Sequence, residues 1–152
     1  METVVTALAV LSEIPARRHI VVLGEISESP PPMRRAYQRI GAKAAEICDQ
    51  PILVGSKSLL KNYASGIRTV ERGNPKIVRS CNAIATVLEN LEQIKSGDVV
   101  LIKGSARQHL EQIALHLAGQ QVGCSLPQCY AKMIYERCSM LKLDWQSPTP
   151  NA

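Results

Sequence analysis

The sequence predicts an α/β fold, a Rossmann-like three-layer sandwich with a mostly parallel sheet. One observation is that short β-branched apolar runs alternate along the chain with longer amphipathic segments, which is typical of right-handed strand–helix–strand units. The other is composition: 45% of the residues are hydrophobic, yet only 3% are aromatic and none is phenylalanine. A core of Ile, Leu, Val and Ala suits strands that helices cover on both faces.

The spacing of apolar residues places the elements in order. Helices are predicted at 4–14, 33–48, 59–64, 82–94 and 108–118, where apolar side chains recur at helical spacing. Strands are predicted at 19–23, 52–54 and 99–102, with further short strands at 67–70 and 76–79. Pro15 should end the first helix, and the third should close near Gly66.

The chain divides by composition into three parts. Residues 1–120 are expected to form the α/β domain, 121–145 a helical extension that contains cysteines, and 146–152 a disordered tail that is polar and rich in proline.

The cysteines give no strong metal signal. Cys124, Cys129 and Cys138 lie at C-x4-C and C-x8-C spacing, which is wider than most pairs in structural zinc sites. We interpret them as ordinary reduced thiols, with a metal or redox site as the alternative. Cys48 and Cys81 are expected in or near the core.

Net charge and hydropathy indicate which classes of binding partner to expect. The formal net charge of +5 mildly favours a small anionic ligand, but the scarcity of aromatic residues argues against nucleic acid. No apolar run approaches the roughly 20 residues of a membrane span, so no membrane partner is expected. The first 18 residues lack the basic start of a secretory signal, which predicts a cytoplasmic location.

The densest basic stretch comprises Arg34, Arg35, Arg39 and Lys43. We interpret it as the solvated face of a helix, with phosphate or nucleic-acid contact as the alternative.

Several reaction classes lack their motifs. The Gly55–Ser58 stretch lacks the spacing of a P-loop, and Gly24 is not followed by a dinucleotide-binding fingerprint. The histidines form no ligand pattern; His109 could approach a bound anion, or it could be an ordinary surface histidine. We therefore predict no catalytic residue, no metal site and no cofactor for the chain alone.

The most informative segment is GDVVLIKGSARQHLE, which begins at Gly97. A buried strand at 99–102 is followed by Lys103, Gly104 and Ser105, which supply a cation, a flexible residue and a helix N-cap. Ligands bind at the carboxyl ends of parallel strands, and the N–H groups of a following helix favour an anion. The segment therefore predicts a binding site without naming a reaction.

Two carboxylates follow the first predicted strand. Glu25 and Glu28 should lie at the same edge of the sheet, where they could bind an ammonium group or a metal-bound ligand. A solvated loop is the alternative.

Three segments, in the same order, resemble the C-terminal domain of the Mur ligases. RRHIVVLGEISE is similar to the family's strand and G-[DE]-M-x-E-L, with matches at Gly24, Glu25 and Glu28. The helix that begins at Met33 is similar to the family's H-x-x-x-G-x-x-A helix, with a match at Gly41. GDVVLIKGSARQHLE is similar to G-D-V-V-L-V-K-G-S-R-x-M-x-x-E. The resemblance is greatest to the member that adds D-alanyl-D-alanine to UDP-N-acetylmuramoyl-tripeptide.

The resemblance implies amide-bond ligation in peptidoglycan synthesis. In that family one domain binds the UDP-sugar peptide, a central domain holds ATP and magnesium, and the C-terminal domain receives the incoming amine and closes over ATP. It implies that Glu25, Glu28, Lys103, Gly104, Ser105 and Arg107 contact substrate. It also implies a stand-alone or truncated domain that works with ligase domains on another chain and is inactive alone.

Departures from the family pattern leave a second hypothesis open. Tyr37 replaces the helix histidine, Ala106 replaces the arginine after K-G-S, although Arg107 is adjacent, and Gln108 replaces the methionine. The alternative is a repurposed, non-catalytic module that binds a protein partner or a small anionic ligand.

Overall fold

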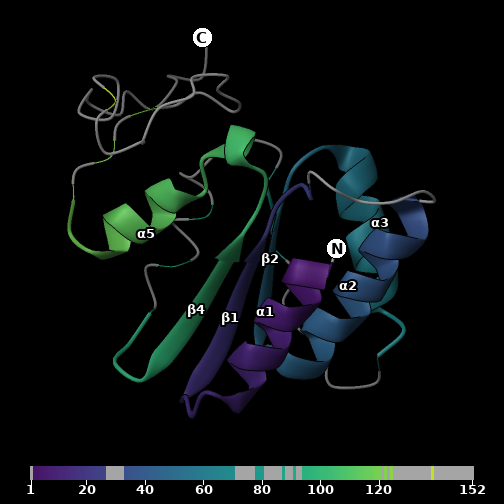
Figure 1. The fold of residues 1–152 in the computed structure, drawn as a ribbon, viewed down its shortest axis with the longest axis horizontal. Coiled ribbons are helices and arrows are strands. Elements are labelled where there is room, and N and C mark those ends of the chain that lie inside the picture. Colours follow the sequence, from purple (N-terminus) through teal and green to yellow (C-terminus); the bar gives the residue numbers. More distant parts are fainter. Residues whose placement is uncertain are drawn as a thin grey trace, which may run out of the picture.

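A parallel sheet with helices on both faces forms the centre of the molecule (Figure 1). The computed structural model describes residues 2–26, 33–70, 78–80 and 94–120, together with positions 87, 91, 122, 124 and 138. The predicted α/β sandwich is confirmed.

The described part of the sheet has the strand order β3-β2-β1-β4. Its strands are β1 (Arg18–Leu23), β2 (Gln50–Val54), β3 (Val78–Ser80) and β4 (Asp98–Lys103). All neighbours pair in parallel, and β4 follows β1 in register from Arg18 beside Asp98 to Leu23 beside Lys103. The chain moves outward from β1 to β3 and returns beside β1 as β4. This reversal of direction is where open α/β sheets form their ligand crevice.

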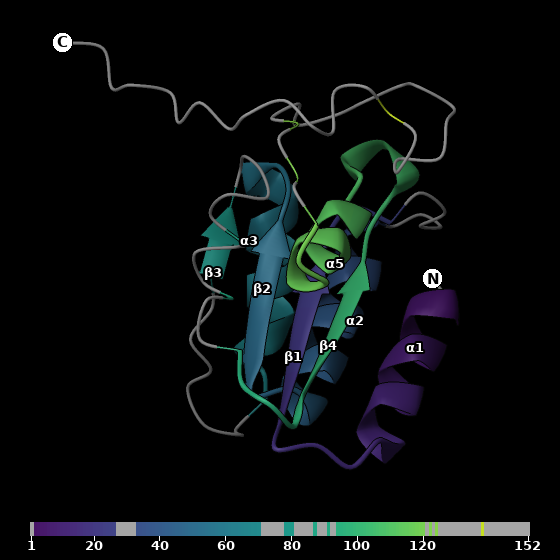
Figure 2. The same ribbon diagram turned by 90° about the vertical axis from the view of Figure 1, so that its left-hand side faces the viewer.

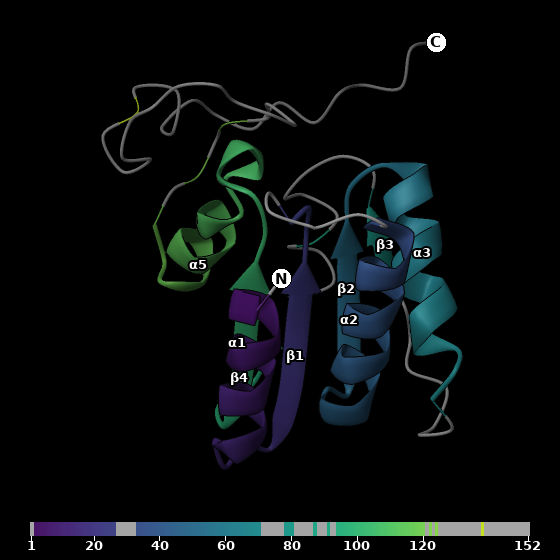
Figure 3. The ribbon, with the colours of Figure 1, turned by 45° about the vertical axis from the view of Figure 1, so that its right-hand side comes forward.

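One face of the sheet is covered by three helices: α1 (Glu2–Glu13), α2 (Met33–Ile47) and α3 (Lys57–Ile67) (Figure 3). Alternate side chains of β1, Val21 and Leu23, pack against this layer. The α1 helix contributes Val4, Leu8 and Leu11, which repeat at the spacing of one helical face.

The other face is covered by α5 (Glu111–Leu117) and by residues on the connection to β4 (Figure 2). The intervening β1 side chains, Ile20 and Val22, pack here. Val87 and Leu91 are helical and fully buried in the same cluster, as the predicted helix at 82–94 requires. Ile94 lies just outside a helix, and the rest of that segment lies outside the described residues.

The α2 and α3 helices approach each other at two glycines. A side chain at Gly41 would collide with the backbone carbonyl of Tyr63, and one at Gly66 would collide with that of Gln38. The Gln38 amide also donates to the Ser65 hydroxyl at 3.2 Å. Because backbone meets backbone, glycine is required at both positions.

The predicted helix at 59–64 is longer in the structure, where α3 spans Lys57–Ile67. It closes near Gly66, as predicted, and that glycine lies inside its last turn, where it admits α2. The predicted strand at 67–70 does not exist: Ile67 is the last helical residue, and the N–H groups of Arg68, Thr69 and Val70 donate back to helix carbonyls. The apolar residues Ile67 and Val70 therefore belong to the end of a helix and the turn after it, and not to a strand.

Other predictions are only partly testable. The strand at 76–79 is observed as 78–80, whereas Lys76 and Ile77 lie outside the described residues. So do Glu28, the tail at 146–152 and most of the extension at 121–145. Each helix within the described part of the chain is too short or too polar to cross a bilayer.

Candidate functional site

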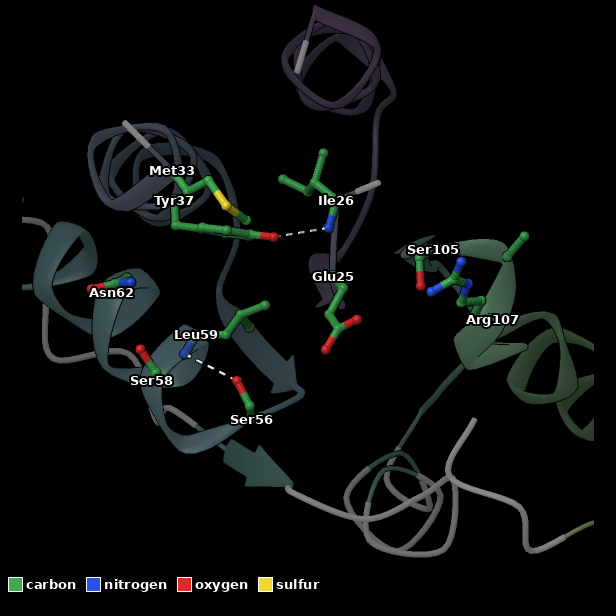
Figure 4. Close-up of a pocket in the computed structure, with 11 residues that line it drawn as sticks. Glu25, Ile26, Met33, Tyr37, Ser56, Ser58, Leu59, Asn62, Ser105 and Arg107 are labelled. Atoms are coloured by element: carbon green, nitrogen blue, oxygen red, sulfur yellow. Dashed lines mark hydrogen bonds between the residues drawn. The ribbon is translucent and has the colours of Figure 1, made fainter. Parts of the chain in front are cut away.

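A pocket of about 630 Å³ opens at the carboxyl ends of β2, β1 and β4 (Figure 4). Its lining residues follow these strands or lie on the adjoining helices: Glu25, Ile26, Met33, Tyr37, Ser56, Ser58, Leu59, Asn62, Ser105, Ala106 and Arg107. The pocket therefore lies at the sheet edge that the sequence predicts. We call it the strand-end pocket.

Opposite charges line the strand-end pocket. Glu25 lies two residues beyond β1, and its side chain extends into the space between α3 and the 105–107 segment. Arg107 enters from the segment after β4. These are the charged residues of the described lining. A carboxylate and a guanidinium in one pocket suit a ligand that carries an ammonium group and an acidic group.

Uncharged polar groups come from the start of α3. Ser56 caps the helix, with its hydroxyl accepting from the Leu59 N–H at 3.4 Å, and Ser58 and Asn62 lie on the next turns. The hydroxyls and the amide can donate or accept hydrogen bonds with a ligand.

Two tyrosines hold the end of β1. The buried Tyr63 hydroxyl donates to the Gly24 carbonyl at 2.9 Å, and the Tyr37 hydroxyl accepts from the Ile26 N–H at 3.1 Å. The rings meet edge to face at 4.9 Å. Burial raises the pKa of Tyr63 well above its ordinary value, with a smaller contribution from Tyr37, so Tyr63 stays a neutral donor. Tyr37, which departs from the family pattern, therefore fixes the segment that carries Glu25.

Gln108 joins three strand ends. Its side-chain oxygen accepts from the N–H groups of Glu25 at 2.6 Å and Ser105 at 3.3 Å. Its side-chain nitrogen donates to the Val54 carbonyl at 3.3 Å. Sequence reasoning missed this role and treated Gln108 only as a departure from the family. The available signal was the S-x-x-Q spacing from Ser105, which matches a capping box.

The predicted site residues divide between two cavities. Glu25, Ser105 and Arg107 line the strand-end pocket, whereas Lys103 and Gly104 line a neighbouring cavity of about 320 Å³ beside α5. Ser105 borders both cavities. Glu28 lies outside the described residues.

The predicted helix at 108–118 is wrong at its start. Residues Ala106–Gln108 form a 3-10 turn, η1, and α5 begins only at Glu111. His109 separates them with a left-handed backbone (φ 47°). No long helix therefore follows Ser105 to present free N–H groups to an anion, and the Ser105 N–H already pairs with Gln108.

His109 fits neither interpretation that the sequence offered. It is 7% exposed, so it is not a surface histidine, and it lines neither described cavity. Its Nδ1 lies 2.6 Å from the Glu111 carboxylate.

A separate ion cluster closes the opposite end of the sheet. The Asp98 carboxylate, whose side chain is fully buried, lies 2.6 Å from Arg18 Nη2 and 2.7 Å from Arg17 Nη2. It also accepts from the Lys95 N–H at 3.0 Å. Arg18 foremost, then Lys95 and Arg17, holds the pKa of Asp98 far below its usual range. This cluster fixes the start of β4 and lies away from the site.

The described cysteines are reduced thiols. Cys48 is buried in the core, as predicted, and Cys124 lies buried with Val122, with Leu115 and Cys138 against them. Cys81 and Cys129 lie outside the described residues. Within the described ranges, no three side chains of His, Cys, Asp or Glu gather in a way that could hold a metal ion.

Comparison with known proteins gives one finding. The family model described as "Mur ligase, glutamate ligase domain" matches residues 1–106, from the start of the chain through β4 to η1. No curated protein matches the chain significantly.

Proposed function

Because the chain belongs to the Mur ligase C-terminal domain family, we propose that it is the amine-receiving part of an ATP-dependent ligase of peptidoglycan precursors. The domains that bind the UDP-sugar peptide and ATP lie outside these 152 residues, and the reaction takes place in the cytoplasm. The chain alone forms no amide bond.

The incoming substrate is a small zwitterion, and we propose D-alanyl-D-alanine. The observation that carries this proposal is that Glu25 and Arg107 line the same pocket at the strand ends. Glu25 accepts hydrogen bonds from the substrate ammonium group, and the planar guanidinium of Arg107 binds the substrate carboxylate through two parallel hydrogen bonds.

The pocket residues orient the incoming amine and take no part in making or breaking bonds. In the family reaction an amine attacks an acyl phosphate, and a held amine reacts faster because its approach is already fixed. Glu25 positions the amine, and the hydroxyls of Ser56 and Ser58 can hydrogen-bond the peptide unit. Lys103 and Ser105 both line the neighbouring cavity beside α5, and the resemblance implies that they contact a phosphate or a substrate carboxylate.

The pocket does not make a nucleotide site by itself. Its described lining supplies one carboxylate and no glycine-rich phosphate loop, whereas ATP sites combine such a loop with magnesium ligands. We propose that ATP and magnesium enter only with a complete ligase.

Binding of the dipeptide to the purified chain tests this proposal. We expect a Kd of roughly 1 mM, typical of a few exposed polar contacts, and a loss of at least tenfold in Glu25→Gln and in Arg107→Met. Lys61→Met, on the exposed side of α3, is the control and should leave the affinity unchanged. Binding that is equally strong in the Glu25 and Arg107 variants would contradict the assignment.

The repurposed module is the second candidate, favoured by Ala106 in place of the family arginine. A pull-down of the tagged chain from its own cell extract separates the two. Recovery of a protein with a P-loop and a UDP-sugar domain supports the ligase. Recovery of unrelated proteins, together with failure to bind the dipeptide, supports the module.

A further inference from the structure

The Gln108 side chain fills the space between two walls of the strand-end pocket. It is 7% exposed, and all three of its contacts are backbone groups at strand ends. One wall carries Glu25 and the other carries Ser105 and Arg107. The amide therefore links the two segments that hold the charged residues of the pocket.

Two glycines make room for this amide. A side chain at Gly24 would collide with the Gln108 amide and with Leu110, and one at Gly104 would meet the same pair. Gly24 and Gly104 are neighbours across β1 and β4, where the Gly24 N–H donates to the Lys103 carbonyl at 2.8 Å. The Gln108 amide and the Leu110 side chain therefore occupy the space beside both glycines.

Few side chains can make the hydrogen bonds that Gln108 makes. The side chain must accept two N–H bonds at one atom and donate to a carbonyl from another atom. A primary amide does both, and so does a protonated carboxyl group. A methionine thioether cannot donate, and an ionised carboxylate would face the Val54 carbonyl without a proton to share.

We propose that Gln108 is a positioning residue of the strand-end pocket, with its amide oxygen held where the oxygen of a bound anion would otherwise lie. The Glu25 and Ser105 N–H groups, which could bind a phosphate or carboxylate, are satisfied internally. A ligand carboxylate is thereby directed to Arg107, and Glu25 is kept facing it. This proposal rests on the proposed function, because it concerns the same pocket.

The test compares full-length chains that carry Gln108→Met, Gln108→Glu or the control Gln112→Met. Gln112 suits the control because its amide is also buried, at 1% exposure, but has no hydrogen-bond partner among the described residues. Amide NMR resonances and hydrogen exchange of Glu25 and Ser105 report the pocket walls. Titration with D-alanyl-D-alanine reports binding.

We expect Gln108→Met to shift both amide resonances, to speed their exchange roughly tenfold or more, and to weaken dipeptide binding roughly tenfold. Gln112→Met should change none of these. In Gln108→Glu the defect should be present at pH 7 and reversed as the pH falls through the pKa of the introduced carboxyl, which burial raises. A merely structural residue would show no such pH-dependent recovery of affinity.

Each result has a defined meaning. Unchanged Glu25 and Ser105 amides in Gln108→Met overturn the proposal, as do shifted amides with unchanged affinity. If Gln108→Met does not fold, the pH reversal in Gln108→Glu decides the question. If the wild-type chain binds no dipeptide, the proposed function fails; the proposal about Gln108 then stands or falls on the amide resonances and their exchange.

Discussion

Three side chains support the site by hydrogen bonds to backbone groups at the strand ends. Tyr63, Tyr37 and Gln108 each bond the backbone at 24–26, so the segment that carries Glu25 is held from both faces of the sheet. The sequence could not predict these contacts, because each joins residues far apart in the chain or depends on a turn geometry. It could place Glu25, Ser105 and Arg107 at this edge of the sheet, because they follow predicted strands.

The Tyr63 hydroxyl provides a test of this support. Tyr63→Phe removes the donor to the Gly24 carbonyl and leaves that buried acceptor unpaired. We expect a loss of about 1–2 kcal/mol in the free energy of unfolding, measured by urea denaturation. A variant as stable as the wild type would show that the hydrogen bond does not support the end of β1.

Asp98 provides a pH-dependent prediction. The pKa of its carboxyl is lowered in the folded state, so its contribution to stability is present above the unfolded value of about 4 and is lost as the pH falls below that value. Asp98→Asn should therefore melt several degrees below the wild type at pH 7, and the difference should shrink at pH 3. Glu46→Gln, at an exposed pair with Lys43, is the control and should change little at either pH. A melting difference for Asp98→Asn that stays constant with pH would contradict the ion-pair account.

At the scale of elements, periodicity predicted most of what the structure contains. The patterns of β1, α2 and β2 were sufficient because each buries a regular set of apolar side chains. The strand β4 was also predicted from its apolar run, but its residues are half-buried rather than buried. The wrongly predicted elements are those whose ends are set by tertiary contacts or by a local turn. The strand predicted at 67–70 is instead the end of α3 and a turn, because Arg68, Thr69 and Val70 donate back to helix carbonyls. The helix at 108–118 was interrupted by His109, whose left-handed backbone no apolar pattern reveals.

The crossing of α2 and α3 gives a prediction with an unusual sign. Alanine normally stabilises a helix relative to glycine by up to about 1 kcal/mol. Gly66→Ala should instead destabilise the protein by about 1–3 kcal/mol, because the added carbon meets the Gln38 backbone. Chemical denaturation measures the change. Stabilisation by the alanine would mean that the helices do not approach as closely as described.

At the scale of the whole molecule, topology creates the site. The strands from β1 to β3 are added toward one side of the sheet, and β4 is then added on the other side of β1. Segments about 80 residues apart in sequence therefore meet at one edge of the sheet. The sequence predicted this edge because the candidate residues follow predicted parallel strands, whose carboxyl ends lie at one edge of the sheet. It did not predict that Lys103 and Gly104 would face a second cavity, because their placement depends on the turn at η1 and on α5.

Under the proposed function, the chain binds the incoming dipeptide but forms no amide bond by itself. With ATP, magnesium, D-alanyl-D-alanine and an acceptor carboxylate, the purified chain should release no ADP above background. A complete Mur ligase assayed in parallel is the positive control. Dipeptide-dependent ADP release by the chain alone would contradict the division of labour that we propose.

The most direct test of the central claim is an NMR titration of the full-length chain with D-alanyl-D-alanine and, separately, with its N-acetylated form, which lacks the ammonium group. The account predicts that the free dipeptide shifts the amides of Glu25, Ile26, Ser58 and Arg107, and that N-acetylation abolishes most of this response. Equal responses to both forms, or shifts confined to residues away from the strand-end pocket, would contradict the claim that this pocket receives the amine.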